Sequence, residues 1–333
     1  MDARIGCVVI GRNEGERLRR CLESLAPTCA TLVYVDSDSS DGSVETAKQL
    51  GAHVVALDLT RPFTAARARD EGFEALSTLA PSTVYVLFVD GDCEVVSGFV
   101  EAAAQLLDAR PEVAVVCGRR RERHPEASVY NLLCDMEWDT PIGEAQACGG
   151  DALVRVSAFR EVGGYDPTLI AGEEPELCLR LRRRGHRIVR IDREMTLHDA
   201  AMTRFEQWWK RAVRAGHAYA EGAYRHGRGP ERHWVRETAR LAFYGAALPA
   251  ASIGLAPVTL GTSLGLLSAY PVSALRSYRA SRRSGHDVRS SAIYAAFTTL
   301  AKFPEAQGAA RFALDRLRGR TSHIIEYKSA APR

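Results

Sequence analysis

Acidic side chains follow directly on a short apolar segment near residue 90. Residues 86–95 read VLFVDGDCEV, so Asp90, Asp92 and Glu94 stand at alternate positions after a run of β-branched and aromatic residues. Carboxylates beside a hydrophobic core are costly to desolvate unless a positive group neutralises them. A divalent cation would neutralise them, although Asp and Gly are also common in plain turns after strands. The segment is therefore compatible with a metal site and with an ordinary turn.

Two further groups of acidic residues have types and spacings that suit chemistry. Residues 35–43 read VDSDSSDGS, where Asp36 and Asp38 can accept hydrogen bonds from a ribose or a base and Asp41 can cap a helix. Glu173 and Glu174 stand just before a proline, as acidic residues often do at helix starts. A carboxylate pair can also supply a general base that takes a proton from an attacking hydroxyl group. Both interpretations of each group stay open at this point.

Alternating apolar and amphipathic segments must position these side chains. The predicted strands are residues 5–10, 31–35, 53–57, 84–89 and 113–117, and the predicted helices are residues 14–25, 43–50, 64–79 and 97–109. This alternation predicts βαβ units on a parallel sheet, in which ligands bind outside the carboxyl ends of the strands. Polar residues 11–14, 36–41 and 90–94 all follow strands, so we expect them at one ligand-binding edge.

No glycine-rich phosphate cradle follows the first strand. The segment VVIGRNEGE has the wrong spacing for a dinucleotide fingerprint, and the sequence contains no GxxxxGK[ST] motif. A protein that binds a diphosphate without such a loop can hold it through Mg²⁺ or a similar ion, which takes one or two carboxylates plus phosphate oxygens. Asp90 and Asp92 match that requirement.

Composition excludes few classes of function. The chain has 333 residues, 44 basic and 41 acidic, and its formal charge of +3 does not suggest nucleic acid as a partner. The eight cysteines form no CxxC pair, which favours reduced thiols in a cytosolic compartment over a zinc ribbon or a disulfide framework. The N-terminal residues lack the long apolar stretch of a signal peptide.

The second half of the chain changes character. We expect a catalytic domain over residues 1–230, ending in an aromatic and basic helix at 204–226, and a helical C-terminal region over residues 231–333. Residues 241–275 contain no charged side chain, and about 20 apolar residues suffice to span a bilayer. Three prolines favour a broken helical hairpin over one long span, namely Pro249, Pro257 and Pro271. The following RSYRASRR favours membrane contact over the alternative, a soluble helical pair.

The ordered set of motifs strongly resembles the family 2 glycosyltransferases of glycosyltransferase-A fold. The motifs are CVVIGRNE, VDSDSSDGS, ARARDEG, FVDGDCE, GGDALVRVSAFREVGGYDPTLIAGEEPELCLRLRRRG and LHDAAMTRFEQWWKRAVRAG, within residues 4–216. The resemblance implies a Rossmann-like α/β fold with a parallel or mixed sheet. It also implies a nucleotide-diphosphate-sugar donor, a divalent ion (Mg²⁺ or Mn²⁺) and inversion at the anomeric carbon.

The resemblance implies a role for each motif. The donor-binding residues would be Arg12, Asn13, Glu14, Asp36, Asp38, Arg69 and Asp90, with Gln207, Trp208 and Arg211 closing over the diphosphate. The metal ligands would be Asp90, Asp92 and His198. The catalytic pair would be Glu173 and Glu174, with Glu174 as the base. Glu stands there in place of the commoner Asp, which lengthens the reach by one methylene group.

A weaker resemblance extends into the C-terminal region. The segments AYPVSALRSYRASRR, YAAFTTLAKFPEAQGAARF and IIEYK resemble the membrane-associated tail of bacterial enzymes that assemble polysaccharides. We therefore expect a saccharide or lipid-linked acceptor and a location on the cytoplasmic side of the inner or plasma membrane. The alternatives are a sugar-nucleotide nucleotidyltransferase and a non-catalytic membrane scaffold. The first would carry a Gly-rich loop after its first strand, and the second would have lost the acidic motifs.

Overall fold

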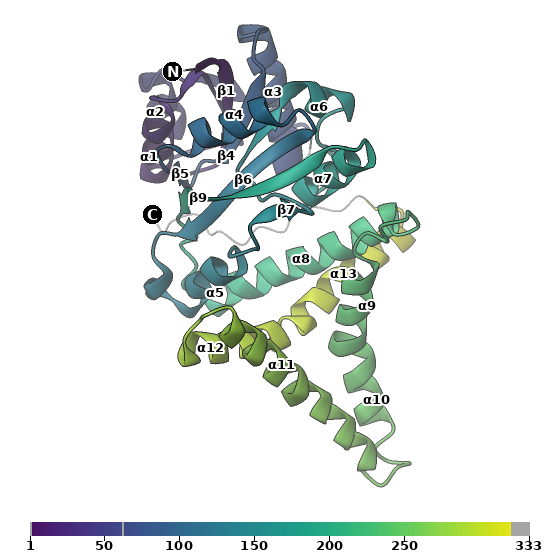
Figure 1. Cartoon of the computed structure of the whole chain (residues 1–333). Helices are drawn as coiled ribbons and strands as arrows, with labels where there is room; N and C mark the ends of the chain where they lie inside the picture. The colour runs from purple at the N-terminus through teal and green to yellow at the C-terminus, as the bar shows by residue number, and fades with distance from the viewer. Residues whose placement is uncertain (1, 62, 321–333) are drawn as a thin grey trace. The chain divides into compact units, whose positions relative to one another are not determined.

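The first of two units in the chain is built on a nine-stranded mixed sheet (Figure 1). The computed structural model describes residues 2–61 and 63–320. By their contacts the described residues divide into a first unit, residues 2–124 and 137–201, and a second unit, residues 125–136 and 202–320. The sequence placed the domain boundary at residue 230, whereas the division by contacts falls after residue 201.

The strands follow the order β3-β2-β1-β4-β8-β6-β9-β5, with β7 paired to β9. Their bounds are β1 (Asp2–Gly11), β2 (Cys29–Asp36), β3 (His53–Ala56), β4 (Tyr85–Asp90), β5 (Cys93–Val95), β6 (Val113–Glu122), β7 (Gly143–Ala145), β8 (Ala152–Arg155) and β9 (Arg187–His198). β1 to β4 pair in parallel, as the βαβ pattern predicts, whereas β8 runs antiparallel to both β4 and β6. The sheet is therefore mixed.

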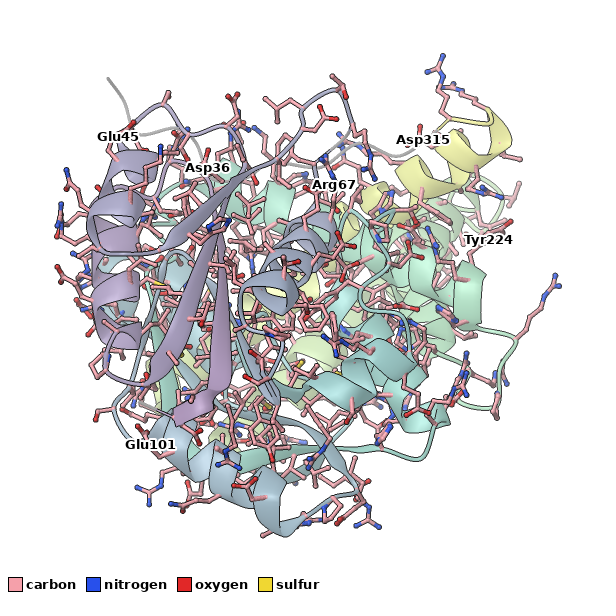
Figure 2. The ribbon with its side chains drawn as sticks, turned by 90° about the horizontal axis from the view of Figure 1, so that it is seen from above. Asp36, Glu45, Arg67, Glu101, Tyr224 and Asp315 are labelled. Atoms are coloured by element: carbon pink, nitrogen blue, oxygen red, sulfur yellow. The ribbon has the colours of Figure 1, made fainter. Side chains whose placement is uncertain are left out.

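Six α-helices accompany the sheet in the described part of the first unit. They are α1 (Glu16–Leu25), α2 (Ser43–Gln49), α3 (Ala65–Leu79), α4 (Phe99–Ala109), α6 (Val156–Glu161) and α7 (Glu173–Arg183), while α5 (Val129–Glu137) ends in it and lies mostly in the second unit. α3 packs closely on β1 and β2, because a Cβ at Gly72 would lie 2.4 Å from Val8 Cγ1. Figure 2 shows Asp36, Glu45 of α2 and Arg67 of α3 toward the same side of this unit. This is the side where parallel strands end and the following helices begin.

The second unit is helical. It contains most of α5 together with α8 (Phe205–His226), α9 (Val235–Ala242), α10 (Leu248–Gly254), α11 (Ala269–Arg283), α12 (Val288–Leu300) and α13 (Lys302–Leu317). α8 and α13 cross at close range, because a Cβ at Gly216 would lie 1.9 Å from the Glu305 carbonyl oxygen and one at Gly308 equally close to that of Val213. This contact explains why α8 belongs with the C-terminal helices rather than with the sheet.

The uncharged segment 241–275 forms a broken hairpin, as the prolines predicted. A π-helical turn (Phe243–Ala247) leads into α10, and a 3-10 segment (Thr262–Ser268) leads into α11. α10 and α11 converge on the connection between them, away from α8 and α13 (Figure 1). Among the described residues, no helix is both long enough and apolar enough to cross a bilayer. The IIEYK segment lies outside the described residues.

Candidate active site

The acidic residues that end β2 and β4 meet at one edge of the sheet. In the strand register Gly11 of β1 pairs with Asp36, and Ile10 pairs with Asp90. Asp36 and Asp90 therefore end the strands on either side of β1, about two strand spacings or 10 Å apart. The turn after β4 is fixed to β1, since the Gly91 backbone N–H donates to the Ile10 carbonyl oxygen.

The loops after β1 and β2 hold each other in place. The Asn13 backbone N–H donates to Ser39 Oγ at 2.9 Å, and Asn13 Oδ1 accepts from the Ser40 N–H at 2.8 Å. Asp36 is buried, and its two oxygens accept from the Tyr34 hydroxyl group and the Ser39 N–H. These contacts bring the predicted donor-binding loops side by side and orient the Asp36 carboxylate.

Three other predicted donor-binding residues belong to the same loops. The Arg12 guanidinium lies over the Phe63 ring, 5.1 Å from its centroid, and Glu14 pairs with Arg17 at 2.8 Å. Asp38 has a φ of 72°, a left-handed conformation that Asp tolerates better than most residues. Asp41, in contrast, binds the first residue of α2, because its carboxylate accepts hydrogen bonds from the Ser43 N–H and hydroxyl group.

Arg69 of α3 joins the strand end to the helix that carries the predicted base. Its guanidinium lies 2.7 Å from Asp90 Oδ1, 2.9 Å from Glu173 Oε1 and 3.1 Å from Glu174 Oε1, with its side chain 2% exposed. The ring of Tyr165 lies beneath it, 5.6 Å from the guanidinium carbon to the centroid. One buried cation therefore holds three carboxylates that lie 21 to 105 positions after it in the chain.

Arg120 and Asp151 complete this cluster, and the sequence reasoning gave neither a role. Arg120 donates to Asp90 Oδ2 at 3.0 Å and pairs with Asp151 at 2.7 Å. Asp151 is fully buried, and it also accepts from the Asp90 N–H and from the Thr196 hydroxyl group. Asp151 stands inside the GGDALVR part of a motif quoted from the sequence and Arg120 does not, and only the pairing of β4, β6 and β8 shows that they meet.

Asp92 and His198 face each other across the β5–β9 pair. Cys93 is in register with His198, and His198 Nε2 lies 3.3 Å from Asp92 Oδ2. On its other side, His198 Nδ1 lies 3.2 Å from Oε2 of Glu122, a fully buried carboxylate that also accepts from the Ala200 N–H. The Trp138 ring packs edge-on against the imidazole at 4.7 Å. Glu122 is a third residue to which the sequence analysis assigned no role.

Comparison with known proteins indicates the family of this domain. Residues 7–162 match the model of the family described as Glycosyl transferase family 2. The chain carries a family 2 glycosyltransferase domain. It is 30% identical over 289 residues to the pre-mycofactocin glycosyltransferase of Mycobacterium tuberculosis, covering 83% of this chain and 57% of that protein. It is 26% identical over 197 residues to the succinoglycan biosynthesis protein ExoA of Rhizobium meliloti, covering 54% and 58%.

The fold of this chain also has solved counterparts. A mannosyltransferase from Pyrobaculum calidifontis, solved with GDP-Man and Mn²⁺, superposes with a TM-score of 0.61 at 20% identity, covering 94% of this chain and 88% of that one. TarS of S. aureus superposes with a TM-score of 0.50 at 13% identity, covering 91% of this chain and 55% of that one. These likenesses confirm the predicted glycosyltransferase-A fold. The chain spans less than three fifths of the length of the curated relatives it matches.

The donor set of the glycosyltransferase domain fits a divalent cation. Asp92, Cys93 and His198 place ligand atoms within 4.8 Å of one another, and all three residues are buried. Glu122 at Nδ1 leaves Nε2 facing Asp92, as in metal sites where a carboxylate orients a ligating histidine. Asp90 has two guanidinium partners, and its direct metal ligation stays a prediction.

Negative charge outweighs positive charge in this part of the glycosyltransferase domain. Six carboxylates accompany two guanidinium groups and one histidine; the carboxylates belong to Asp90, Asp92, Glu122, Asp151, Glu173 and Glu174. A diphosphate would add further negative charge. Buried charge of one sign is costly, so this composition favours a bound cation and the protonation of a carboxyl group.

Glu174 is the carboxyl group of this cluster whose protonation the excess negative charge favours. Burial and the neighbouring Glu173 raise the pKa of Glu174 to about 7, although Arg69 acts in the opposite direction. Gly172, with a φ of 82°, begins α7 and places Glu173 and Glu174 in its first turn. A carboxylate with a pKa near neutrality is a suitable general base, because it can accept a proton at little cost.

The predicted residues of α8 have contacts within the second unit. Gln207 Oε1 accepts from the backbone N–H groups of Thr203 and Arg204, which caps the helix. Trp208 is buried and packs edge-on against Phe297 at 5.0 Å. Arg211 lies on the same helix, half-buried. Contact of these three residues with the donor stays a prediction.

Proposed function

We propose that the chain transfers a sugar from a nucleotide-diphosphate-sugar, by preference a uridine one, to a hydroxyl group, with a divalent cation and inversion at the anomeric carbon. One observation carries this proposal. Arg69 links Asp90, which lies beside the Asp92–His198 pair, to Glu174, a carboxyl group with a pKa of about 7. The guanidinium group of Arg69 thus connects the proposed cation site to the proposed base.

The reaction requires two things of the protein: neutralisation of the leaving diphosphate and removal of a proton from the acceptor. The leaving diphosphate must have its charge neutralised, and Asp92 and His198 would hold the divalent ion that supplies this as a Lewis acid. The incoming hydroxyl group must lose a proton, which Glu174 accepts at Oε1 or Oε2. Arg69 keeps Glu174 and Asp90 in a fixed relation. Inversion requires that Glu174 and the diphosphate lie on opposite faces of the sugar.

The acceptor we propose is a saccharide carried on a lipid, in the assembly of a cell-surface polysaccharide. The resemblance to a protein named for succinoglycan biosynthesis supports a saccharide acceptor. The tip of the hairpin supports a lipid surface, because Val258 is 78% exposed and Leu260 94% exposed. Arginines follow on α11, where anionic headgroups would attract them. We therefore propose that the chain acts on the cytoplasmic face of the inner or plasma membrane.

The decisive measurement is nucleoside diphosphate release from a panel of sugar nucleotides that includes uridine and guanosine donors. With Mn²⁺ or Mg²⁺ we expect one donor to turn over, and Asp92→Asn to reduce this at least a hundredfold. Asp192→Asn, an exposed position on β9, is the matched control and should keep full activity. Pyrophosphate release from a nucleoside triphosphate would instead indicate a nucleotidyltransferase, and no turnover or binding of any donor would contradict the proposal.

A further inference from the structure

Two cysteines from distant parts of the first unit lie against each other beside the base helix. Cys148, in the loop between β7 and β8, has its Sγ 3.6 Å from Sγ of Cys178 on α7. Cys148 is half-buried and Cys178 is buried, and both are free thiols. The proposed mechanism gives neither sulfur a role. Two thiols at this separation can form a bond of about 2.05 Å after an approach of roughly 1.5 Å.

Each thiol belongs to a segment that holds site residues. Cys178 lies one turn after Glu174 on α7, on the same face of the helix. Cys148 stands three residues before Asp151, which holds Arg120 and the Asp90 backbone. The two segments already touch, since Arg182 of α7 donates to the Gln146 carbonyl oxygen. Movement at the sulfurs would therefore act on both halves of the charged cluster.

The loop has little freedom to absorb such a movement. A Cβ at Gly150 would lie 2.5 Å from Asp90 Oδ2, 2.8 Å from Arg69 Nη2 and 3.1 Å from Arg120 Nη2. The backbone at Gly150 thus packs directly on the Asp90 ion pairs. Displacements of about 1 Å in a catalytic group can cost about a hundredfold in rate.

We propose that Cys148 and Cys178 form a reversible disulfide that turns the transferase off under oxidising conditions. The oxidant is a low-molecular-weight disulfide of the glutathione class. Sγ of Cys148, the more exposed thiol, loses its proton and attacks the oxidant, which expels one glutathione thiolate and leaves a mixed disulfide. Sγ of Cys178 then attacks Cys148 Sγ and expels the second thiolate. Two protein thiols are oxidised by two electrons, and one glutathione disulfide is reduced to two thiols.

The surroundings of the two sulfurs favour the second step over the first. Hydrogen bonds from the Cys148 thiol and backbone lower the pKa of Cys178, whereas its hydrogen bond to Cys178 and burial raise the pKa of Cys148. A thiolate attacks faster than a thiol. Attack on the oxidant is therefore slow, and closure of the protein disulfide is fast. The mixed disulfide does not accumulate while Cys178 is present.

The test treats the whole chain with oxidised glutathione and maps its thiols by mass spectrometry of unreduced peptides. We expect a Cys148–Cys178 peptide pair in the wild type, released by dithiothreitol. Cys178→Ser should trap glutathione on Cys148, and Cys148→Ser should form neither product. Cys134→Ser, a buried thiol in the second unit, is the control and should react as the wild type does. Oxidation of Cys148→Ser at the wild-type rate and extent would overturn the proposal.

The regulatory part rests on the proposed function and has its own readout. Nucleoside diphosphate release should fall at least tenfold on oxidation of the wild type and recover with dithiothreitol, while Cys148→Ser should keep its activity in oxidised glutathione. A disulfide that forms without changing the activity of an active enzyme would overturn the switch. If no donor turns over even in the reduced protein, the failure lies with the proposed function, and the peptide map still decides whether the disulfide forms.

Discussion

At the scale of single residues, Arg69 and Arg120 hold the buried carboxylates of the site together through ion pairs. The sequence predicted the acidic residues because strand ends, spacing and family resemblance all mark them. It did not predict Asp151 or Glu122, because a buried carboxylate is marked only by its partners, and these come from strands far away in the chain. The acidic residues that follow a strand can thus be predicted from the sequence as candidate ligands or bases. The buried residues that orient them can be identified only in the folded sheet.

Glu174→Gln should lower the turnover number by about 10² to 10⁴, since the amide cannot accept the proton. The wild-type turnover number should rise with pH and level off above pH 7, because the base works only when ionised and burial raises its pKa to about 7. Turnover is measured at saturating donor and metal between pH 5.5 and 8.5. Glu101→Gln, an exposed position on α4, should leave the profile unchanged. Full activity in Glu174→Gln would remove Glu174 from the role of base.

Glu122→Gln should weaken Mn²⁺ binding by about 10- to 100-fold, as loss of an outer carboxylate does at other metal sites. The Gln oxygen still accepts from His198 Nδ1–H, so the charge is lost and the hydrogen bond is kept. Calorimetric titration of Mn²⁺ in the presence of nucleoside diphosphate measures the effect without any turnover. Glu194→Gln, which alters an exposed ion pair on β9, is the comparison variant. Equal Mn²⁺ affinity in the Glu122 variant and the wild type would mean that His198 is not a ligand or needs no orientation.

At the scale of elements, the register of the strands brings together two residues that lie in separate sequence motifs. Asp92 follows β4, and the short β5 after it pairs antiparallel with the end of β9, which brings Asp92 beside His198. The family resemblance predicted His198 as a metal ligand, but the sequence showed no sign of β5, whose three residues are too few for a periodic pattern. Parallel strands and long helices are predictable from periodicity, and short antiparallel strands such as β5, β7 and β8 are not.

The crossing of α8 and α13 makes a prediction at this scale. Gly216→Ala should lower the free energy of unfolding by about 1 to 3 kcal/mol, because the added methyl group meets backbone of α13 and the helices must separate. Chemical denaturation followed by circular dichroism measures this. Gly254→Ala, at an open position of α10, should be neutral or slightly stabilising. Equal stability of the two variants would show that the helices do not cross this closely.

At the scale of the whole molecule, the sequence predicted an α/β part followed by a helical part with a broken apolar segment. It placed the boundary after α8, because that helix continues the family motifs, whereas packing assigns the helix to the helical unit. A helix can continue the sequence motifs of one unit and still pack with the other. Its packing depends on contacts such as those of Gly216 and Gly308, which no local sequence pattern shows.

Membrane attachment through the hairpin tip can be tested on the whole chain. Inserting one large apolar side chain into a bilayer is worth about 1.5 to 3 kcal/mol, so Val258→Asp or Leu260→Asp should weaken binding to vesicles of anionic lipid by tenfold or more. Binding should also weaken with salt, because the tip is followed by the arginines of α11. Nucleoside diphosphate release from the donor alone should be unaffected.

The control for the hairpin tip is Leu317→Asp, which places the same charge at an equally exposed apolar position of α13. If the control loses vesicle binding as strongly as Leu260→Asp does, attraction to lipid is a property of the general surface and the tip has no special part in it. If neither variant changes binding, the arginines of α11 act alone, and the apolar tip must cover something other than lipid. Loss confined to the tip variants is the result that the uncharged segment and its exposed end predict.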